Sequence, residues 1–328
     1  MPPTWSVVAT VDEPAPLVVA FVLHHLESGA QEVALFLDGP NPEAQDHLSG
    51  IKQARVVLCD EAHWAASPRR RRPKLHPGRQ LTNANIAYGQ TRADWLLHCD
   101  CDEFVRDGAA LAQELDGMAD KHLYLRLQVA ERVYLGPATD DLFEGGFRSA
   151  LEDFAAIGPS IYGALAPFLK DGLTGHRAGK GVVRTGLPLV MGIHSPEGRP
   201  PHKSARTPLV HFDGLTRLHY MIKLLRRAHE PPTQAPPRHG APRIEQFGQM
   251  RALVDQPGQA HDLVESLKSL SRTQQEALRA LDALDMRPFR PLGRNPMADD
   301  LTVTAMDRAL RARHYDFLQA HAPGFLAP

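Results

Sequence analysis

The sequence is short of cysteine, of long apolar runs and of net charge. Its 328 residues include three cysteines, too few for a disulfide framework, and this favours a reducing compartment. No apolar run approaches the ~20 residues of a transmembrane helix, and the longest candidate, residues 17–23, is interrupted at once by His24 and His25. The first residues do not read as a signal peptide, so we expect a cytoplasmic protein.

Charge is nearly balanced, with 37 Lys and Arg against 38 Asp and Glu and a formal net charge of −1. Nucleic-acid binders usually carry a basic excess and disordered tails a large charge of one sign, so neither class is expected and nucleic acid is not a predicted partner. A hydrophobic fraction of 43% is ordinary for a globular protein. The length favours one large domain, or such a domain with a smaller helical annex.

Strand-like and helix-like segments alternate through the N-terminal part of the chain. Short apolar or β-branched runs predict buried strands at residues 6–11, 32–37, 55–59, 94–99 and 122–129. Helical periodicity and start signals predict helices at residues 16–28, 41–49, 78–90 and 109–118. This alternation predicts an α/β fold, a mixed and mostly parallel Rossmann-like sheet with helices on both faces.

The rest of the chain divides by composition. Residues 130–215 are Gly-rich and read as irregular, with fragments of strand, and residues 229–242 hold five prolines. From about residue 245 onward leucines recur at helical spacing, namely Leu263, Leu267, Leu270, Leu278, Leu281 and Leu284. We therefore expect a main domain at residues 1–228, a Pro-rich linker at 229–244 and a C-terminal helical extension at 245–328. The extension reads as an amphipathic hairpin, with a partner-binding coiled coil as the alternative.

Carboxylates follow three of the predicted strands, and parallel sheets bind ligands at the carboxyl ends of their strands. These carboxylates are Asp12 and Glu13, Asp38, and Asp100 with Asp102. The triplet Asp100-Cys101-Asp102 is the most informative, because two carboxylates two positions apart can converge where a buried strand ends. Hard oxygen ligands there suit Mn²⁺ or Mg²⁺, completed by water and substrate phosphate. The alternative is a pair of solvated turn carboxylates.

A resemblance to a known family rests first on residues 94–105, which begin with Asp94-Trp95 and continue to Asp100-Cys101-Asp102-Glu103-Phe104. This segment is similar to the acidic segment of the family 2-like glycosyltransferases, bacterial relatives of the family 92 group, which have the GT-A fold. Residues 8–13 resemble the first-strand K-N-E segment of that family. Only Glu13 matches it strictly, because Val11 and Asp12 replace the Lys and the Asn.

Further similarities follow in the same order, and the resemblance covers residues 5–228. They are His24-His25 with Gly29, Leu37-Asp38, Gln80 with Asn83 and Asn85, Gly179 to Arg184 (the family's G-K-x-hydrophobic-x-R), Gly192 to His194, and His211-Phe212 followed by Lys223.

The resemblance implies a hexosyltransferase-like enzyme that moves a sugar from a nucleoside-diphosphate sugar to an acceptor hydroxyl, on a glycan or another molecule. It implies a divalent metal on the acidic segment, and a role in cell-surface or secreted polysaccharide biosynthesis is expected. The residues expected to bind the donor are Thr10, Glu13, Asp38, Gln80, Asn83 and Asp100.

Histidine is abundant, with 17 residues, and most of them read as structural or solvated. His194 and His211 are the better candidates for the metal or the diphosphate, because a distant neutral imidazole can join Asp100 and Asp102 as a further ligand. No H-E-x-x-H or C-x-x-C spacing occurs, which argues against a zinc hydrolase. The pair Cys99 and Cys101 reads as two small strand residues.

Two groups of cations stand out. Lys180 and Arg184 lie in a Gly-flanked segment and are expected to stabilise the leaving diphosphate, with a surface strand of solvated charges as the alternative. Residues 69–72 are four arginines, and Pro73-Lys74 follow. That block reads as a solvated loop. The functional alternatives are binding of a phosphorylated acceptor, or peripheral contact with anionic lipid headgroups.

An inverting enzyme also needs a carboxylate base near the acceptor hydroxyl. The candidates are Asp140, Asp141, Glu144, Glu197 and Asp213, with Asp213 favoured because it stands beside His211. Without a base a retaining mechanism is admissible.

Two other functions are kept open. One is a non-catalytic sugar-nucleotide or glycan-binding module, because the K-N-E segment is degraded. The other is a nucleotidyltransferase. Such an enzyme would be expected to have a Gly-rich basic loop after the first strand, whereas this chain has Asp12-Glu13-Pro14 there, which argues against it.

Overall fold

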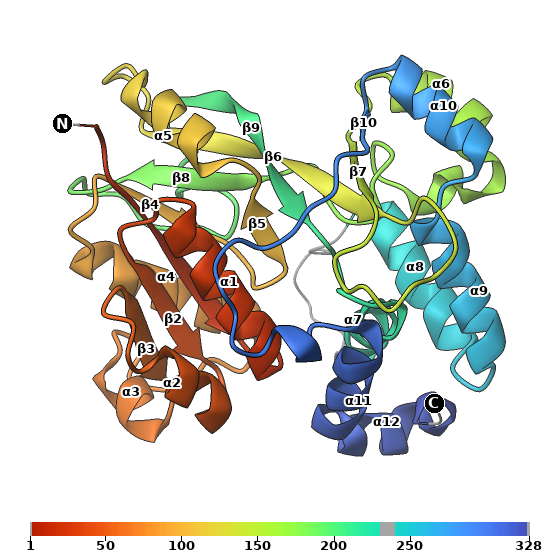
Figure 1. Cartoon of the computed structure of the whole chain (residues 1–328), viewed down its shortest axis with the longest axis horizontal. Helices are drawn as coiled ribbons and strands as arrows, with labels where there is room; N and C mark the ends of the chain where they lie inside the picture. The colour runs from red at the N-terminus through yellow and green to blue at the C-terminus, as the bar shows by residue number, and fades with distance from the viewer. Residues whose placement is uncertain (1, 230–239, 327–328) are drawn as a thin grey trace. The chain divides into compact units, whose positions relative to one another are not determined.

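The computed structural model describes residues 2–229 and 240–326, and its contacts divide the chain into two compact units (Figure 1). The first unit holds Met1–Val129, Ala178–Val210 and Pro291–Ala298. The second holds Ala130–Arg177, His211–Arg290 and Asp299–Pro328. Most of the predicted Pro-rich linker, residues 230–239, lies outside the described residues. The division into domains at residues 228 and 244 stays a prediction.

The first unit is built on a mixed sheet. Four parallel strands lie in the order β3-β2-β1-β4, and β8 and then β6 continue the order, with β8 antiparallel to both β4 and β6. The strands are β1 (Trp5–Val11), β2 (Val33–Leu37), β3 (Ala54–Leu58), β4 (Trp95–His98), β5 (Glu103–Val105), β6 (Tyr124–Val133), β8 (Lys180–Arg184) and β9 (His202–His211). Of β6 and β9, residues up to Val129 and Val210 belong to this unit. The predicted α/β class is confirmed, with its parallel strands in the N-terminal part of the sheet.

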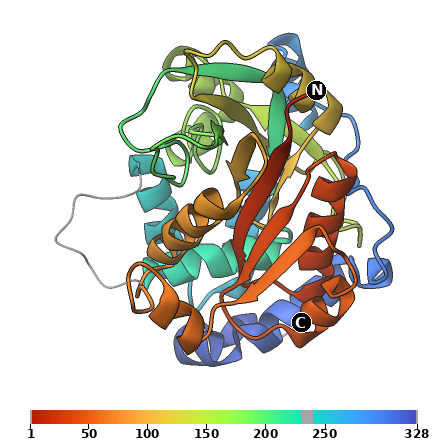
Figure 2. The same cartoon turned by 90° about the vertical axis from the view of Figure 1, so that its left-hand side faces the viewer.

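Helices cover both faces of these strands, as predicted. Figure 2 shows α1 (Ala15–Glu27), in red, and α4 (His76–Gln90), in orange, on opposite sides of the sheet. Strands β1, β2 and β4 are buried along their whole length, which is why their sequences are mostly apolar. The unit also contains α2 (Pro42–Leu48), α3 (Glu61–Ala66) and α5 (Gly108–Asp116). The short helix α3 lies where the sequence predicted only a loop.

The core on the α4 side is made where helix and sheet meet. Ala84 and Ala87 of α4 pack in one cluster with Val8, Phe36 and Trp64. Small residues on this face of α4 let the helix approach the strands closely, and α4 is thereby fixed against the sheet. This packing positions the polar side chains of α4 for the site described below.

A late segment completes the first unit on the other face. Residues Pro291–Ala298 belong to it, although they follow a long stretch of the second unit, His211–Arg290. The Leu292 N–H donates to His24 Nδ1 at 3.1 Å, and Asn295 Nδ2 donates to the Pro16 carbonyl at 3.1 Å. His24 Nε2 therefore carries the ring proton and donates to the Val105 carbonyl at 2.9 Å. His24 is a structural residue, as predicted, and both ring nitrogens have partners.

The second unit contains the end of β6, paired antiparallel with β7 (Gly146–Ser149), which pairs with β10 (Leu284–Asp285). Its helices are α6 (Phe154–Tyr162), η1 (Gly163–Phe168), α7 (Arg217–Ala228), α8 (Ala241–Ala252), α9 (Pro257–Lys268), α10 (Arg272–Ala280), α11 (Val303–Arg313) and α12 (Tyr315–His321), with 3-10 turns at Ala298–Asp300 and Pro323–Phe325. The described chain after residue 245 is mostly helical, as predicted, and its standing as a separate C-terminal extension stays a prediction. The leucine series, however, is not one helical hairpin, because Leu270 and Leu281 lie outside helices and Leu284 lies in β10.

The Gly-rich middle of the chain is more regular than its sequence predicts. Two of its glycines are required where the backbone turns into a strand pairing. Gly145 (φ +121°) and Gly179 (φ +65°) are left-handed, and a Cβ on either would collide with a carbonyl oxygen of β6. The glycines mark close backbone approach in a sheet.

Within residues 2–229 and 240–326, no helix combines the length and the apolarity needed to span a bilayer.

Candidate active site at the strand ends of the first unit

The acidic turn predicted after the fourth strand connects β4 to β5. The Asp100 N–H donates to Glu103 Oε2 at 2.8 Å, so the first residue of β5 closes the turn. The side chain of Asp100 remains 35% exposed, whereas those of Asp102 and Glu103 are buried. Asp100 is therefore the most exposed carboxylate of this turn.

Lys180, the first residue of β8, lies beneath the turn. Its Nζ is 2.9 Å from Asp100 Oδ2 and 3.2 Å from Glu103 Oε2, and its side chain is fully buried. Burial opposes the charged ammonium, but Asp100 and Glu103 outweigh burial and raise the pKa of Lys180 above its ordinary value. Burial likewise opposes ionised Asp100, and Lys180 holds the pKa of that carboxyl well below its usual range.

Two other elements fix this ion pair. Gly179, in the left-handed conformation described above, brings the start of β8 against Leu127 of β6 and so aims Lys180. Gln80 of α4 donates from Nε2 to Asp100 Oδ1. Both oxygens of Asp100 thus accept hydrogen bonds from within the unit, and the carboxylate is held in one orientation.

The two cysteines of the turn region are buried thiols. Burial raises the pKa of Cys99 and of Cys101 well above the ordinary value, so both stay protonated. They pack as small residues, as their sequence context indicated, and offer no thiolate to a soft metal.

The acidic turn has the ligand chemistry of a hard cation. Asp100 and Glu103 pair with the ammonium of Lys180, and the buried carboxylate of Asp102 belongs to the same turn. In the described part of the chain, no three His, Cys, Asp or Glu side chains gather as a metal site. Mg²⁺ and Mn²⁺ are commonly held by one or two carboxylates together with water and substrate phosphate. The residues present therefore fit an ion that binds along with a diphosphate.

The two histidines predicted to assist the metal lie in different units. His194 belongs to the first unit, and its Nδ1 is 3.1 Å from the carbonyl of Gly179, which precedes Lys180 in sequence. His211 closes β9 and belongs to the second unit, where its ring lies 6.4 Å from that of His176, centroid to centroid.

Asp38, at the end of β2, is contacted by two arginines and a histidine. Arg72 Nη2 is 2.9 Å from Oδ1, Arg79 Nε is 2.7 Å from Oδ2, and His76 Nδ1 is 3.4 Å from Oδ2. Burial alone opposes ionisation here, but His76, Arg72 and Arg79 prevail and lower the pKa of Asp38 to about 2. Sequence reasoning missed these pairs. Asp38 is an anchor for the basic segment that follows α3.

Thr10 and Asn83, both expected to bind the donor, bind each other. Asn83 Nδ2 donates to Thr10 Oγ1 at 3.0 Å, and His63 Nε2 lies 2.9 Å from Asn83 Oδ1. Both predicted residues are buried. They join α4 to β1 and α3 inside the first unit.

Glu13 lies just before α1, at the end of β1. It is half-buried, and its Oε2 accepts the Asp12 N–H at 2.8 Å. The side chain folds back on the neighbouring backbone, as acidic residues at helix starts do.

Arg184 does not join Lys180. It ends β8, and because β8 runs antiparallel to β4, it pairs in register with Trp95 at the start of β4. Its guanidinium lies 4.4 Å from the centroid of a Trp95 ring. Four strand positions separate it from Lys180, roughly 13 Å. Its contacts are those of a residue that packs on the far end of the sheet.

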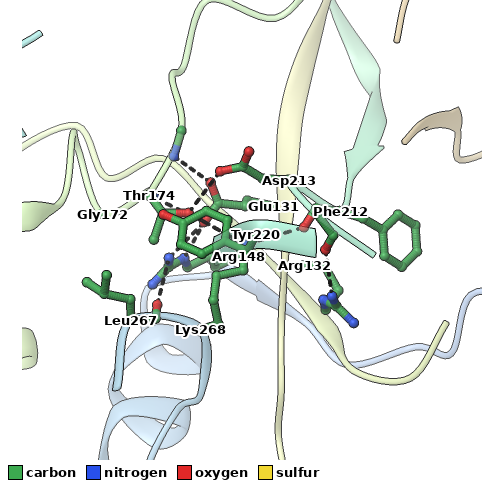
Figure 3. Close-up of polar contacts among 12 residues, drawn as sticks. Glu131, Arg132, Arg148, Gly172, Thr174, Phe212, Asp213, Tyr220, Leu267 and Lys268 are labelled. Atoms are coloured by element: carbon green, nitrogen blue, oxygen red, sulfur yellow. Dashed lines mark hydrogen bonds and ion pairs between the residues drawn. The ribbon is translucent and has the colours of Figure 1, made fainter. Parts of the chain in front are cut away.

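The second unit contains a buried network of charged side chains that sequence reasoning missed (Figure 3). Glu131 of β6 contacts Arg148 of β7 at 2.7 Å and Lys268 of α9 at 3.8 Å, and it accepts the Thr174 hydroxyl at 2.8 Å. All these side chains are almost fully buried. The signal in the sequence is a pair of charges, Glu131-Arg132, with apolar residues directly before and after it in the strand.

Asp213, the favoured candidate base, belongs to the same network. Its Oδ2 is 3.1 Å from Arg243 Nη1 and its Oδ1 is 3.5 Å from Lys223 Nζ. Burial opposes its ionisation, but Arg243 and Lys223 hold its pKa well below the usual range. A carboxylate in this state is a weak proton acceptor, so its contacts weigh against the role of base, which stays a prediction.

The other candidate bases are distributed over both units. Asp140, Asp141 and Glu144 lie in the second unit, where Asp140 accepts the Thr304 N–H, Asp141 contacts Arg290 and Glu144 accepts the Thr139 hydroxyl. Glu197 lies exposed in the first unit. Their role as a base stays a prediction.

No protein-family model and no curated protein matches this chain. Solved structures similar to it include a mannosyltransferase from Pyrobaculum calidifontis in complex with GDP-Man and Mn²⁺, with 13% identity over 99% of this chain and 86% of that one and a TM-score of 0.36. Glucosyl-3-phosphoglycerate synthase from Mycobacterium tuberculosis, in complex with Mn²⁺ and UDP, is 14% identical, with 40% of this chain covered and a TM-score of 0.28. A CMP:2-keto-3-deoxy-manno-octonic acid synthetase complexed with CTP is 13% identical, with 44% covered and a TM-score of 0.27. The chain spans 44% and 62% of the length of these last two.

Proposed function

We propose that this chain is a glycosyltransferase that takes a sugar from a nucleoside-diphosphate donor at the strand ends of its first unit. The observation that carries the proposal is the Asp100–Lys180 pair, in which a partly exposed carboxylate is fixed above a buried ammonium. It stands at the carboxyl end of β4, where sheets of this type bind ligands. The similarity of residues 94–105 to the acidic segment of family 2-like glycosyltransferases supports the same function.

The chain's own residues would divide the work as follows. Asp100, kept ionised by Lys180 and oriented by Gln80, accepts hydrogen bonds from donor hydroxyls. Lys180 is a positioning residue, because it is buried beneath the carboxylate. Asp100 and Asp102 would hold Mn²⁺ or Mg²⁺, which supplies positive charge opposite the departing diphosphate. The acceptor hydroxyl, on a glycan or another molecule, needs a base, for which Asp213 is the sequence-based candidate.

We place this reaction in the cytoplasm, in the synthesis of cell-surface or secreted glycans, on the same sequence grounds. The domain that carries it is expected within residues 1–228. The nucleotide-binding experiment below identifies the nucleobase of the sugar donor.

The decisive experiment combines nucleotide binding with substitution of the acidic turn. Calorimetry of the full chain with a panel of nucleoside diphosphates, with and without Mn²⁺, should reveal one preferred nucleotide whose affinity rises with Mn²⁺. Asp102→Ala should abolish the Mn²⁺-dependent part of that affinity and the transfer of sugar. Asp120→Ala, which removes an exposed carboxylate of the same unit, is the matched control. Full turnover by Asp102→Ala, with both variants folded, would overturn the metal assignment.

A non-catalytic sugar-nucleotide or glycan-binding module is the second candidate, and one observation favours it. Of the family's first-strand K-N-E segment only Glu13 is retained, and its side chain accepts the Asp12 N–H at 2.8 Å. A module predicts tight nucleoside-diphosphate binding with neither hydrolysis nor transfer of the donor sugar during long incubation. Detection of sugar release from the preferred donor excludes it.

A further inference from the structure

The basic segment between α3 and α4 is an ordered feature of the first unit that the proposed function leaves unused. It carries Arg69, Arg70, Arg71, Arg72 and Lys74, and all five side chains are exposed. We call residues 69–74 the basic loop. Two acidic residues, Asp60 and Glu61, stand at the start of the preceding helix, and Asp60 is occupied in capping it through the His63 N–H at 2.8 Å. The loop therefore carries a marked local excess of positive charge in a chain with a net charge of −1.

The basic loop is fixed at several points, although like charges repel and favour an extended, mobile chain. Arg69 Nε donates to Thr82 Oγ1 at 3.0 Å, and Arg72 is paired with Asp38 at 2.9 Å. Arg79 Nη1 donates to the carbonyls of Pro73 (3.2 Å) and Lys74 (2.9 Å). These bonds hold the segment against α4 and the end of β2, so its exposed cations are presented at fixed positions.

The backbone of the loop carries strain at an exposed cation. Arg70 has φ +53°, in the left-handed region that disfavours residues other than glycine, and its N–H donates to the Ser67 carbonyl at 2.9 Å. Strained non-Gly residues persist where their surroundings over-determine them, and they gather at functional positions. A merely solvated connection would relax such a turn.

We propose that the basic loop is a docking surface for the anionic headgroups of a lipid bilayer. Its exposed cations, Arg70, Arg71 and Lys74 above all, sit on a loop in which Pro73 is the only apolar residue. Adsorption to a charged bilayer needs such a surface and no cavity, and clusters of four to eight Lys and Arg are characteristic of it. A single phosphorylated ligand would instead be held in a concave site.

The ion pair between Arg72 and Asp38 connects the proposed lipid-binding loop to the candidate active site. It ties the basic loop to the end of β2, on the edge of the sheet that also carries Asp100 after β4. A bilayer bound at the loop would lie near the strand-end edge of the first unit and would suit an acceptor carried by the membrane. That consequence rests on the proposed glycosyl transfer, whereas the lipid binding itself does not.

The test is vesicle flotation of the full chain. Vesicles of phosphatidylcholine and phosphatidylserine in a two-to-one molar ratio should carry the protein at low salt, and pure phosphatidylcholine vesicles should leave it behind. The triple variant Arg70→Gln, Arg71→Gln, Lys74→Gln should partition about 100-fold more weakly, at roughly a factor of five per cation removed. The matched control is Lys52→Gln, Lys121→Gln, Lys203→Gln, which removes the same charge from exposed positions elsewhere in the first unit and should bind like the unaltered chain.

Several results would overturn the proposal. One is equal loss of vesicle binding in both triple variants, which indicates a general charge effect. Another is unchanged vesicle binding together with loss of nucleoside-diphosphate or inorganic-phosphate binding in the loop variant, which assigns the loop to a soluble ligand. Circular-dichroism melting of each variant reports on folding. Nucleoside-diphosphate calorimetry on the same samples tells failure of lipid binding apart from failure of the proposed enzyme.

Discussion

The ammonium of Lys180 lies 2.9 Å from Asp100 Oδ2, although the two residues are far apart in the sequence. One partner is fully buried and the other is 35% exposed, so the charge of the exposed carboxylate is compensated from inside the protein. This arrangement leaves the outer side of Asp100 open to a ligand. It also makes the stability of the first unit depend on a residue of the candidate site.

Replacement of Lys180 by Met should therefore affect stability and binding together. It removes the cation that lies 3.2 Å from the buried Glu103 carboxylate, and removal of one partner of a buried ion pair costs about 3–5 kcal/mol. Urea denaturation should show that loss in the free energy of unfolding, and calorimetry should show weaker binding of the preferred nucleoside diphosphate. Lys121→Met, at an exposed position of the same unit, should stay within about 0.5 kcal/mol of the unaltered chain. Equal stability of the two variants would refute the buried pair.

Gly179 should not tolerate a side chain, because a Cβ there would collide with the backbone. Gly186, which has a similar φ but no such collision, is the control. Gly179→Ala meets both a left-handed φ of +65° and the Leu127 carbonyl oxygen, whereas Gly186→Ala meets a φ of +72° with open space around the Cβ. The Gly186 variant should lose about 1 kcal/mol, which is the cost of the backbone conformation alone. The Gly179 variant should lose several times as much and bind nucleotide more weakly, because Lys180 moves with it. Similar unfolding free energies for the two variants would contradict this account.

The cation cluster around Asp38 predicts a pH dependence with a definite sign. The folded-state pKa of Asp38 is lowered from 3.8 to about 2, so its pairing contributes stability above pH 3.8, and this contribution is lost as pH falls through 2. Asp38→Asn removes that contribution at every pH. The difference in unfolding free energy between the unaltered chain and Asp38→Asn should be constant near pH 6 and shrink between about pH 4 and pH 2. If the difference in unfolding free energy instead grew as the pH fell, the pKa of Asp38 would have to be raised in the folded protein, which contradicts this account.

The Glu131–Arg148 pair of the second unit offers a double-mutant cycle. Glu131→Met removes the carboxylate that the buried Arg148 contacts and should cost about 3–5 kcal/mol. Arg148→Met should cost less, because Lys268 stays 3.8 Å from Glu131. The double variant should cost less than the sum. Chemical denaturation of the four proteins measures the coupling. Additive losses would mean that the two side chains act separately, despite the 2.7 Å contact.

The sequence predicted the elements whose signal is local. Strands β1 to β4 were found because each is a short apolar run in a sheet covered on both faces, and the acidic turn was found because its carboxylates are close together in sequence. The helix α3 was not predicted, because Asp60 and Glu61 are typical loop residues. The hydrogen bond by which Asp60 caps the helix is visible only in the structure.

The partners of the candidate site could not be predicted, because they are tertiary. Nothing local to Asp38 indicates that Arg79 of α4 will neutralise it, and nothing local to Thr10 indicates Asn83. Of the residues that the resemblance picked out, Glu13, Asp38 and Asp100 lie just after strands β1, β2 and β4 of the first unit, and their roles stay predictions. The resemblance did not reveal that several of these polar residues are already bonded to one another, nor that Arg184 lies at the opposite end of its strand from Lys180.

The segment Pro291–Ala298 has a consequence for biosynthesis. Leu292 and Asn295 donate hydrogen bonds to His24 and Pro16 of α1. These bonds can form only after the segment near the other end of the chain has been synthesised. On a ribosome that adds roughly 5–20 residues per second, α1 would emerge many seconds before its covering segment exists. During that interval α1 lacks the two hydrogen bonds that this segment provides. A fragment that stops before residue 291 would lack both bonds permanently.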